Sequence, residues 1–157
     1  MNIFIDKHQK LLQKLIEAKV DFILIGGYAV IYYGYKRTTG DMDLWLKPVN
    51  ENKLKVIEVL KQFQFNKEGI DHINNLDFTK HIAFHFWQEP ERVDCLTRIS
   101  GVNYEEADVL KEIVDFEGLK VPVIHYNHLI SSKITSDRFK DKADIEELQK
   151  INRLKNL

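Results

Sequence analysis

Residues 24–46 read LIGGYAVIYYGYKRTTGDMDLWL, and this stretch decides the fold that we expect. The apolar run at residues 22–25 predicts a short buried strand that ends at Gly26 and Gly27, where a helix over about residues 28–33 begins. A second strand over residues 41–46 starts with two aspartates and then becomes fully apolar. The order strand, glycine turn, helix and strand therefore places an acidic pair beside a glycine pair.

Each residue type in this stretch has a physical use. Gly26 and Gly27 lack a Cβ, so their backbone can pass close to a bulky anion, and a helix start offers unsatisfied N–H groups to a phosphate. Alternation along a strand puts Asp41 and Asp43 on one face and Met42 on the other. Adjacent carboxylates repel each other unless a cation lies between them, and hard oxygen ligands suit Mg²⁺. The stretch predicts a site for Mg²⁺ and phosphate.

The rest of the chain supplies elements of both kinds. We expect further helices over residues 6–19, 50–63, after 103, and from 127 to about 151 with a break near 137–138, further strands over 81–87, 92–96, 114–116 and 119–121, and a loop over 66–80. The expected helix caps are Asp6, Asn50, Asn103 and Asn127. This order predicts a single α+β domain over residues 1–157, with a mixed sheet flanked by helices, a core at about 20–125 and a helical part at about 127–155.

Composition narrows the class of protein. The chain has 23 basic and 24 acidic residues, which argues against a basic face that grips long nucleic acid. Its single cysteine, Cys95, excludes an internal disulfide, and no apolar run approaches the length of a membrane span. We therefore expect a cytoplasmic protein that does not contact a membrane.

The stretch resembles the signature of the DNA polymerase β-like nucleotidyltransferase superfamily. In that signature a hydrophobic residue and a glycine pair precede two acidic residues that alternate with hydrophobic ones, and Ile25 to Gly27 and Asp41 to Leu44 match it. The run from Arg37 through Thr39 to Asp41 is similar to one in the small bacterial members. The resemblance implies a polymerase β-like palm fold and a site for two Mg²⁺ ions, or Mn²⁺. It also implies transfer of a nucleoside monophosphate from an NTP, with Arg37 and Thr39 on the nucleotide.

The superfamily has a third carboxylate on a later strand, next to the first two. Asp94 matches that position best, because Val93 and Cys95 are expected to face the core and Asp94 the opposite side. Asp77 is a weaker rival in a segment that is not strand-like. The resemblance gives Asp94 two roles, as a metal ligand and as the acceptor of the proton from the attacking hydroxyl.

The C-terminal half is similar to the tail of small bacterial members, including the abortive-infection-type toxin nucleotidyltransferases. In that comparison Lys133 and Arg138 contact the triphosphate, while Lys140 and Asp141 support the site. The plainer alternative is a group of ion pairs on a helix surface. Asp41 and Asp43 could likewise be a solvated strand end, and Asp94 an ordinary acid on an edge strand.

The acceptor is not fixed by the residues. The shortness of the chain favours a small molecule, or a partner protein that supplies the surface. One alternative is a toxin-type enzyme that acts on a tRNA end. Another is an inactive, antitoxin-like binding protein that keeps the fold.

Overall fold

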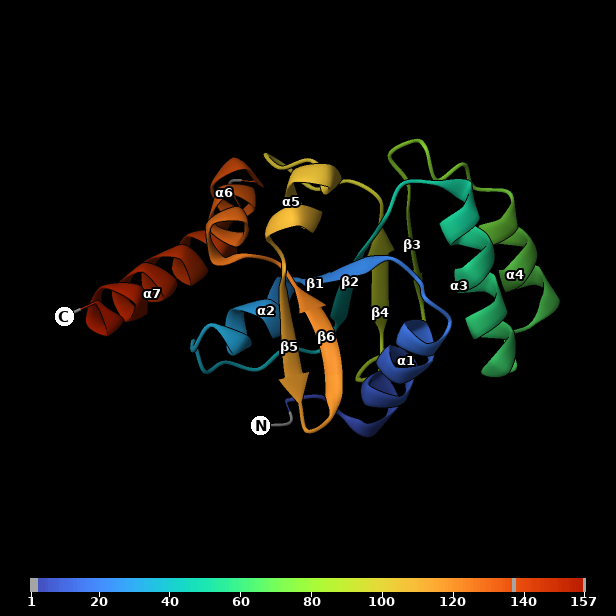
Figure 1. The fold of residues 1–157 in the computed structure, drawn as a ribbon, viewed down its shortest axis with the longest axis horizontal. Coiled ribbons are helices and arrows are strands. Elements are labelled where there is room, and N and C mark those ends of the chain that lie inside the picture. Colours follow the sequence, from blue (N-terminus) through green and yellow to red (C-terminus); the bar gives the residue numbers. More distant parts are fainter. Residues whose placement is uncertain (1–2, 137, 157) are drawn as a thin grey trace.

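The computed structural model describes residues 3–136 and 138–156, and its described strands form one six-stranded mixed sheet (Figure 1). Their order across the sheet is β3-β4-β2-β1-β6-β5. The strands are β1 (Phe22–Ile25), β2 (Met42–Leu46), β3 (Ala83–Phe86), β4 (Val93–Leu96), β5 (Glu112–Phe116) and β6 (Leu119–Val123).

Seven helices surround this sheet in the described part of the chain. They are α1 (Asp6–Glu17), α2 (Gly26–Tyr32), α3 (Asn50–Gln62), α4 (Lys67–Asn74), α5 (Tyr104–Leu110), α6 (Tyr126–Ser136) and α7 (Phe139–Lys155). The expected α+β class with a mixed sheet and C-terminal helices is confirmed. The expected break near 137–138 lies between α6 and α7, although Asp137 itself is outside the described residues.

The pairing of β2 with its two neighbours fixes the position of the acidic residues. β2 runs antiparallel to β1 and parallel to β4. Asp43 is thereby the register partner of Ile25 on one side and of Asp94 on the other. Because side chains directly across a pair share a face, the carboxylates of Asp43 and Asp94 lie on the same side of the sheet.

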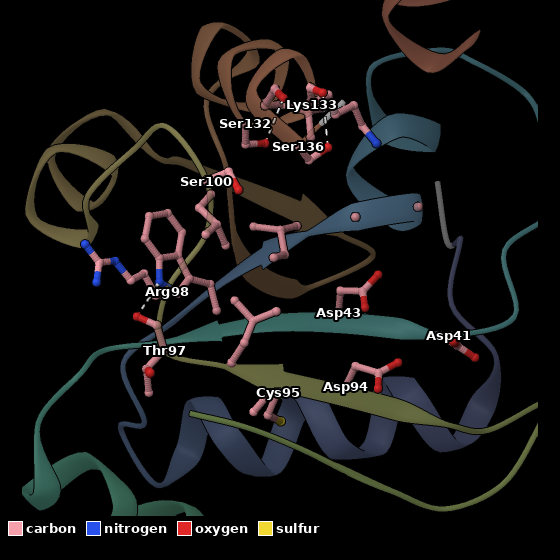
Figure 2. A pocket seen from close by; sticks show the side chains of 18 of the residues that line it. Asp41, Asp43, Asp94, Cys95, Thr97, Arg98, Ser100, Ser132, Lys133 and Ser136 are labelled. Carbon is pink, nitrogen blue, oxygen red and sulfur yellow. Dashed lines mark hydrogen bonds between the residues drawn. The ribbon is translucent and has the colours of Figure 1, made fainter. Parts of the chain in front are cut away.

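The core lies on the opposite side of β2 and β4. Met42 and Leu44 are buried there, and α1 lies on the side of the sheet away from Asp43 and Asp94 (Figure 2). Trp45 is also buried, because Tyr104 of α5 packs edge-on against its ring at 5.2 Å. The Nε1–H of Trp45 donates to the carbonyl of Thr97 at 3.0 Å, so this large residue satisfies its polar atom inside the fold.

The loop expected over residues 66–80 is wrong in its first half, where α4 forms. Asn66 caps this helix by accepting a hydrogen bond from the backbone N–H of Gly69 at 2.7 Å. Ile73 is buried and Ile70 packs against the core, so the helix has an apolar side. The apolar periodicity of the sequence did not indicate this helix, because it is short and has a glycine, which is a poor helix former, in its first turn.

One of the four cap predictions is confirmed and three are wrong. Asn103 accepts from the N–H of Glu106 at 2.9 Å, as expected. Asp6 is wrong, because Ile5 is the cap residue and no side chain caps α1. Asn50 and Asn127 are also wrong, because both lie inside their helices; Asn50 instead holds the backbone N–H of Phe78 at 2.9 Å.

No helix among residues 3–136 and 138–156 has both the length and the apolar character needed to cross a membrane.

Candidate active site

Three carboxylates gather at one end of the β2–β4 pair. Asp43 and Asp94 are register partners on adjacent parallel strands, and Asp41 lies one residue before β2. Figure 2 shows the three side chains along these strands, facing the space below α6. The structure therefore brings together the acidic residues that the sequence predicted, and Asp94, not Asp77, is the one beside Asp43.

Asp77 has a different task. Its carboxylate accepts hydrogen bonds from the backbone N–H and the hydroxyl of Thr79, at 3.0 and 2.7 Å, and from the amide of Asn50 at 3.2 Å. These contacts lower the pKa of Asp77. They describe an aspartate that stabilises an exposed turn.

The carboxylates line a cleft of about 1490 Å³. The cleft extends from the glycine pair and the loop before β2 across to β3, the loop after β4 and α6. It is large enough for a nucleotide and a second molecule together.

Negative charges are crowded around Asp43. Burial raises the pKa of Asp43 to about 6, and the charges of Asp94 and Asp41 add to this effect. Lys140 and Arg138 act in the opposite direction without reversing it. Asp43 is thus a partly buried carboxylate among like charges, and its role in the site stays a prediction.

One guanidinium group, that of Arg92, offsets part of this charge. It donates to Asp94 from Nη2 at 2.9 Å and from Nε at 3.2 Å, and its Nε lies 3.9 Å from Asp41. The Oδ1 atom of Asp41 is buried and has no hydrogen-bond partner among the described residues. A hydrogen bond with Asp41 raises the pKa of the exposed Glu89 nearby. Arg92 and Glu89 were both missed at the sequence level, although Arg92 and Asp94 are two residues apart and so share a strand face.

The residues fit a divalent cation chemically. No three His, Cys, Asp or Glu side chains in residues 3–136 and 138–156 already converge as a ligand set. The orphaned Oδ1 of Asp41 and the repulsion felt by Asp43 are nevertheless what a hard cation would relieve. Asp94 could join them once Arg92 releases it.

The glycine pair is required by close packing. Gly26 has φ +69°, and a Cβ there would lie 2.1 Å from Oδ2 of Asp43. A Cβ on Gly27 would lie 2.3 Å from Oγ1 of Thr39, which donates to the carbonyl of Asp41 at 3.1 Å. The two glycines thus allow the loop before β2 and the carboxylate of Asp43 to lie directly against the start of α2.

Arg37 is held by a residue that the sequence did not single out, Asp144 of α7. Its Nε and Nη2 atoms donate to the two carboxylate oxygens of Asp144 at 2.9 and 3.1 Å. Such a fork restrains both partners in one geometry. The contact of Arg37 with a nucleotide, implied by the resemblance, stays a prediction.

Lys133 completes a network that we call the buried ion-pair cluster: Arg37, Lys133, Arg138, Asp141 and Asp144. The Nζ of Lys133 is shared by Asp141 at 3.1 Å and Asp144 at 2.9 Å, and its side chain is only 6% exposed. Arg138 donates from Nε to Asp141 at 2.8 Å, and the hydroxyl of Ser136 donates to the same carboxylate. Asp141 is fully buried, so this is not a group of surface ion pairs.

Lys133 and Arg138, both predicted to contact the nucleotide, differ in how far their side chains are exposed to the cleft. Lys133 would have to leave a carboxylate to bind a triphosphate directly. Arg138 is also paired with Asp141, but its side chain is 66% exposed and lines the cleft, as does Lys140. The charges of Lys140 and Arg138 oppose the rise in the pKa of Asp43, so both charges lie near the carboxylates.

Comparison with known proteins gives the family of this chain. A family model described as a nucleotidyl transferase of unknown function, DUF2204, matches residues 5–157. The chain belongs to this nucleotidyl transferase family. No curated protein matches this family member, and its likeness to the abortive-infection toxins stays a prediction.

Solved structures show the same fold for this nucleotidyl transferase. The lincosamide antibiotic adenylyltransferase LnuA, bound to lincomycin, has a TM-score of 0.59 at 17% identity, over 96% of this chain and 99% of that one. ANT(2″)-Ia in complex with adenylyl-2″-tobramycin has a TM-score of 0.55 at 13% identity, over 94% and 91%. A Thermotoga maritima protein assigned to the nucleotidyltransferases has a TM-score of 0.55 at 13% identity, over 95% and 90%.

Proposed function

We propose that this chain transfers a nucleoside monophosphate from an NTP to the hydroxyl group of an acceptor. The hydroxyl oxygen attacks the α-phosphorus, a new P–O bond forms, and the bond to pyrophosphate breaks. Membership in a nucleotidyl transferase family supports the transfer of a nucleotide. The adenylyltransferases of the same fold, which hold lincomycin and an adenylylated tobramycin, support a hydroxyl acceptor.

The observation that carries this proposal is the meeting of Asp41, Asp43 and Asp94 on one side of β2 and β4. Two Mg²⁺ ions, or Mn²⁺, held by these carboxylates would neutralise charge on the attacking and leaving oxygens. Asp94, at the side of the pair nearer to β3, accepts the proton of the acceptor hydroxyl after Arg92 has moved aside.

The other residues position the nucleotide. The backbone at Gly26 and Gly27 would lie against the phosphates, and the missing Cβ atoms leave room for the side chains of Asp43 and Thr39. Arg138 and Lys140 neutralise the triphosphate from the cleft wall. Lys133 and Arg37 hold α6 and α7 to the loop before β2, and so act on the nucleotide through their neighbours.

The test is incubation with α-³²P-labelled NTPs and Mg²⁺, with lincomycin, tobramycin, an RNA oligonucleotide or no added acceptor. The wild type is expected to transfer label to one of them or to itself. The double variant Asp41→Ala/Asp43→Ala is expected to lose transfer, and Asp77→Ala serves as the matched control because Asp77 only stabilises a turn.

Two results would change the proposal. Label transfer that persists in the double variant would remove the carboxylates from the site. An absence of both transfer and ATP binding at millimolar concentration, measured by isothermal titration, would instead assign the chain as a binding module that keeps the fold.

A further inference from the structure

The cleft continues past the three carboxylates toward β3 and the loop after β4. We call this part the acceptor arm and define it by its polar lining residues, which are Lys80, His81, His85, Arg98, Ser100 and Asn103. Figure 2 shows Arg98 and Ser100 at the end of the cleft far from Asp41, with Asp43 and Asp94 between.

The arm begins directly beside Asp94. His85 on β3 is the antiparallel register partner of Asp94, so the two Cα atoms are about 4.5–5.5 Å apart and both side chains are on one face. Ala83 shares this face, and both Ala83 and His85 are exposed. A molecule whose hydroxyl is placed at Asp94 therefore extends over β3 and into the arm.

The charge of the arm is opposite to that of the carboxylate site. None of the six residues that define the arm is Asp or Glu, while Asp94 lies beside His85 at the start of the arm and Glu89 lines the same cleft. Arg98 has no ion pair or hydrogen-bond partner for its side chain within the described chain. The charge of Lys80 contributes to lowering the pKa of the Asp77 carboxyl, which accepts hydrogen bonds from Thr79 and Asn50.

We propose that the acceptor is a hydroxyl compound that carries a phosphate group, and that this phosphate binds Arg98 and Lys80 in the acceptor arm. The inference rests on the proposed transfer reaction and names its substrate class. Arginine donors without partners at the end of a cleft suit a phosphate, which accepts charge-assisted hydrogen bonds. The amines of an aminoglycoside such as tobramycin would meet like charges here.

The balance of charge over the whole chain limits the size of the anion. The 23 basic and 24 acidic residues argue against an extended basic face that follows a nucleic-acid backbone. The arm suits one phosphate close to the acceptor hydroxyl, either on a small sugar phosphate or at the end of an RNA.

Nuclear magnetic resonance titration of the ¹⁵N-labelled protein tests this, with Mg²⁺ and a non-hydrolysable ATP analogue present. Ribose 5-phosphate is expected to shift the amide signals of Ser100 and Asn103 in a saturable way, and ribose is not. The variant Arg98→Glu/Lys80→Glu is expected to bind ribose 5-phosphate about 10-fold or more weakly, because charge-assisted contacts are lost. Lys67→Glu, at the start of α4 and outside the cleft, is the matched control and should bind as the wild type does.

Equal affinity for ribose and ribose 5-phosphate, undiminished binding in the charge-reversed variant, or tighter binding of tobramycin at the arm would each overturn the proposal. Arg98→Gln provides a milder variant if the double change disturbs folding. Comparison of ribose 5-phosphate with a short RNA identifies the source of the phosphate, and preference for either supports the shared chemistry. The titration is repeated without nucleotide. If ribose 5-phosphate binds the arm but the protein binds no ATP, the proposed transfer reaction is rejected and the phosphate site in the arm is retained.

Discussion

The carboxylate site and the buried ion-pair cluster both contain aspartates, but their charges are balanced in opposite ways. In the cluster, burial favours the neutral acid, yet Arg138, Ser136 and Lys133 outweigh it and lower the pKa of Asp141 to about 2. In the site, burial and the neighbouring carboxylates raise the pKa of Asp43 to about 6. The difference separates a cluster whose aspartates are paired with cations from a site whose negative charge is only partly balanced.

The strongest test of this difference is to remove Lys133, the cation that Asp141 and Asp144 share. Lys133→Met leaves Asp141 and Asp144 buried with less compensation, so we expect a loss of about 3–5 kcal/mol in the free energy of unfolding. Urea denaturation measures this loss. Lys150→Met, exposed on α7, is the control and should change stability little. An equal effect of the two substitutions would mean that the cluster is not buried as described.

The substitution Asp43→Asn should raise the free energy of unfolding, whereas Lys133→Met lowers it. A raised pKa in the folded state means that the folded protein binds the proton more tightly, so this stability is present below about pH 4 and is lost as pH rises through about 6. The shift from 3.8 to about 6 corresponds to no more than about 3 kcal/mol at roughly 1.36 kcal/mol per pKa unit. The metal-free variant should therefore be more stable than the wild type at pH 8.

Denaturation midpoints at pH 4 to 8 check this prediction, and the two proteins should converge at the acid end. Burial lowers the pKa of His8, whose Nε2–H donates to the Glu91 carbonyl and whose Nδ1 is hydrogen-bonded to the Tyr28 hydroxyl, and this gives a pH effect of opposite sign. Subtraction of the variant curve from that of the wild type removes the contribution of His8.

Added Mg²⁺ should stabilise the carboxylate site and leave the cluster unaffected. At a free concentration ten times its dissociation constant, an ion that binds only the folded state adds about 1.4 kcal/mol. Thermal denaturation with and without Mg²⁺ should show this gain in the wild type and in Arg37→Lys. The gain should be absent from Asp41→Asn/Asp43→Asn, and a gain that survives there would place the ion elsewhere.

The smallest expected effect is that of Arg37→Lys itself. A lysine keeps the charge but gives Asp144 a single donor in place of the fork, so we expect a loss of about 1 kcal/mol. Chemical denaturation measures it. A loss as large as that of Lys133→Met would show that the Arg37–Asp144 fork stabilises the cluster as much as the buried lysine does, which would contradict this ranking.

The sequence predicted the strands around the glycine pair because their apolar runs are continuous and their ends are marked. It also predicted Asp94, because alternation in residues 92–96 assigns that residue to the face opposite the core. These are local patterns with a fixed period.

The contacts of the buried ion-pair cluster join residues of different elements. The bond from Arg37 to Asp144 spans 107 residues, and the contacts of Lys133 cross the break between two helices. No periodicity encodes either. The contact of Lys133 with a triphosphate stays a prediction, and the structure adds that its Nζ is paired with Asp141 and Asp144.

The parallel pairing of β2 with β4 has a consequence for the order of folding. Asp43 and Asp94 are separated in the chain by α3, α4 and β3, so their meeting requires a non-local contact, which forms slowly compared with a helix or a hairpin. A nascent chain that has released only the glycine pair and the first two aspartates holds an incomplete site. Nucleotide chemistry should thus begin only after the sheet has closed, which makes activity a sensitive reporter of complete folding.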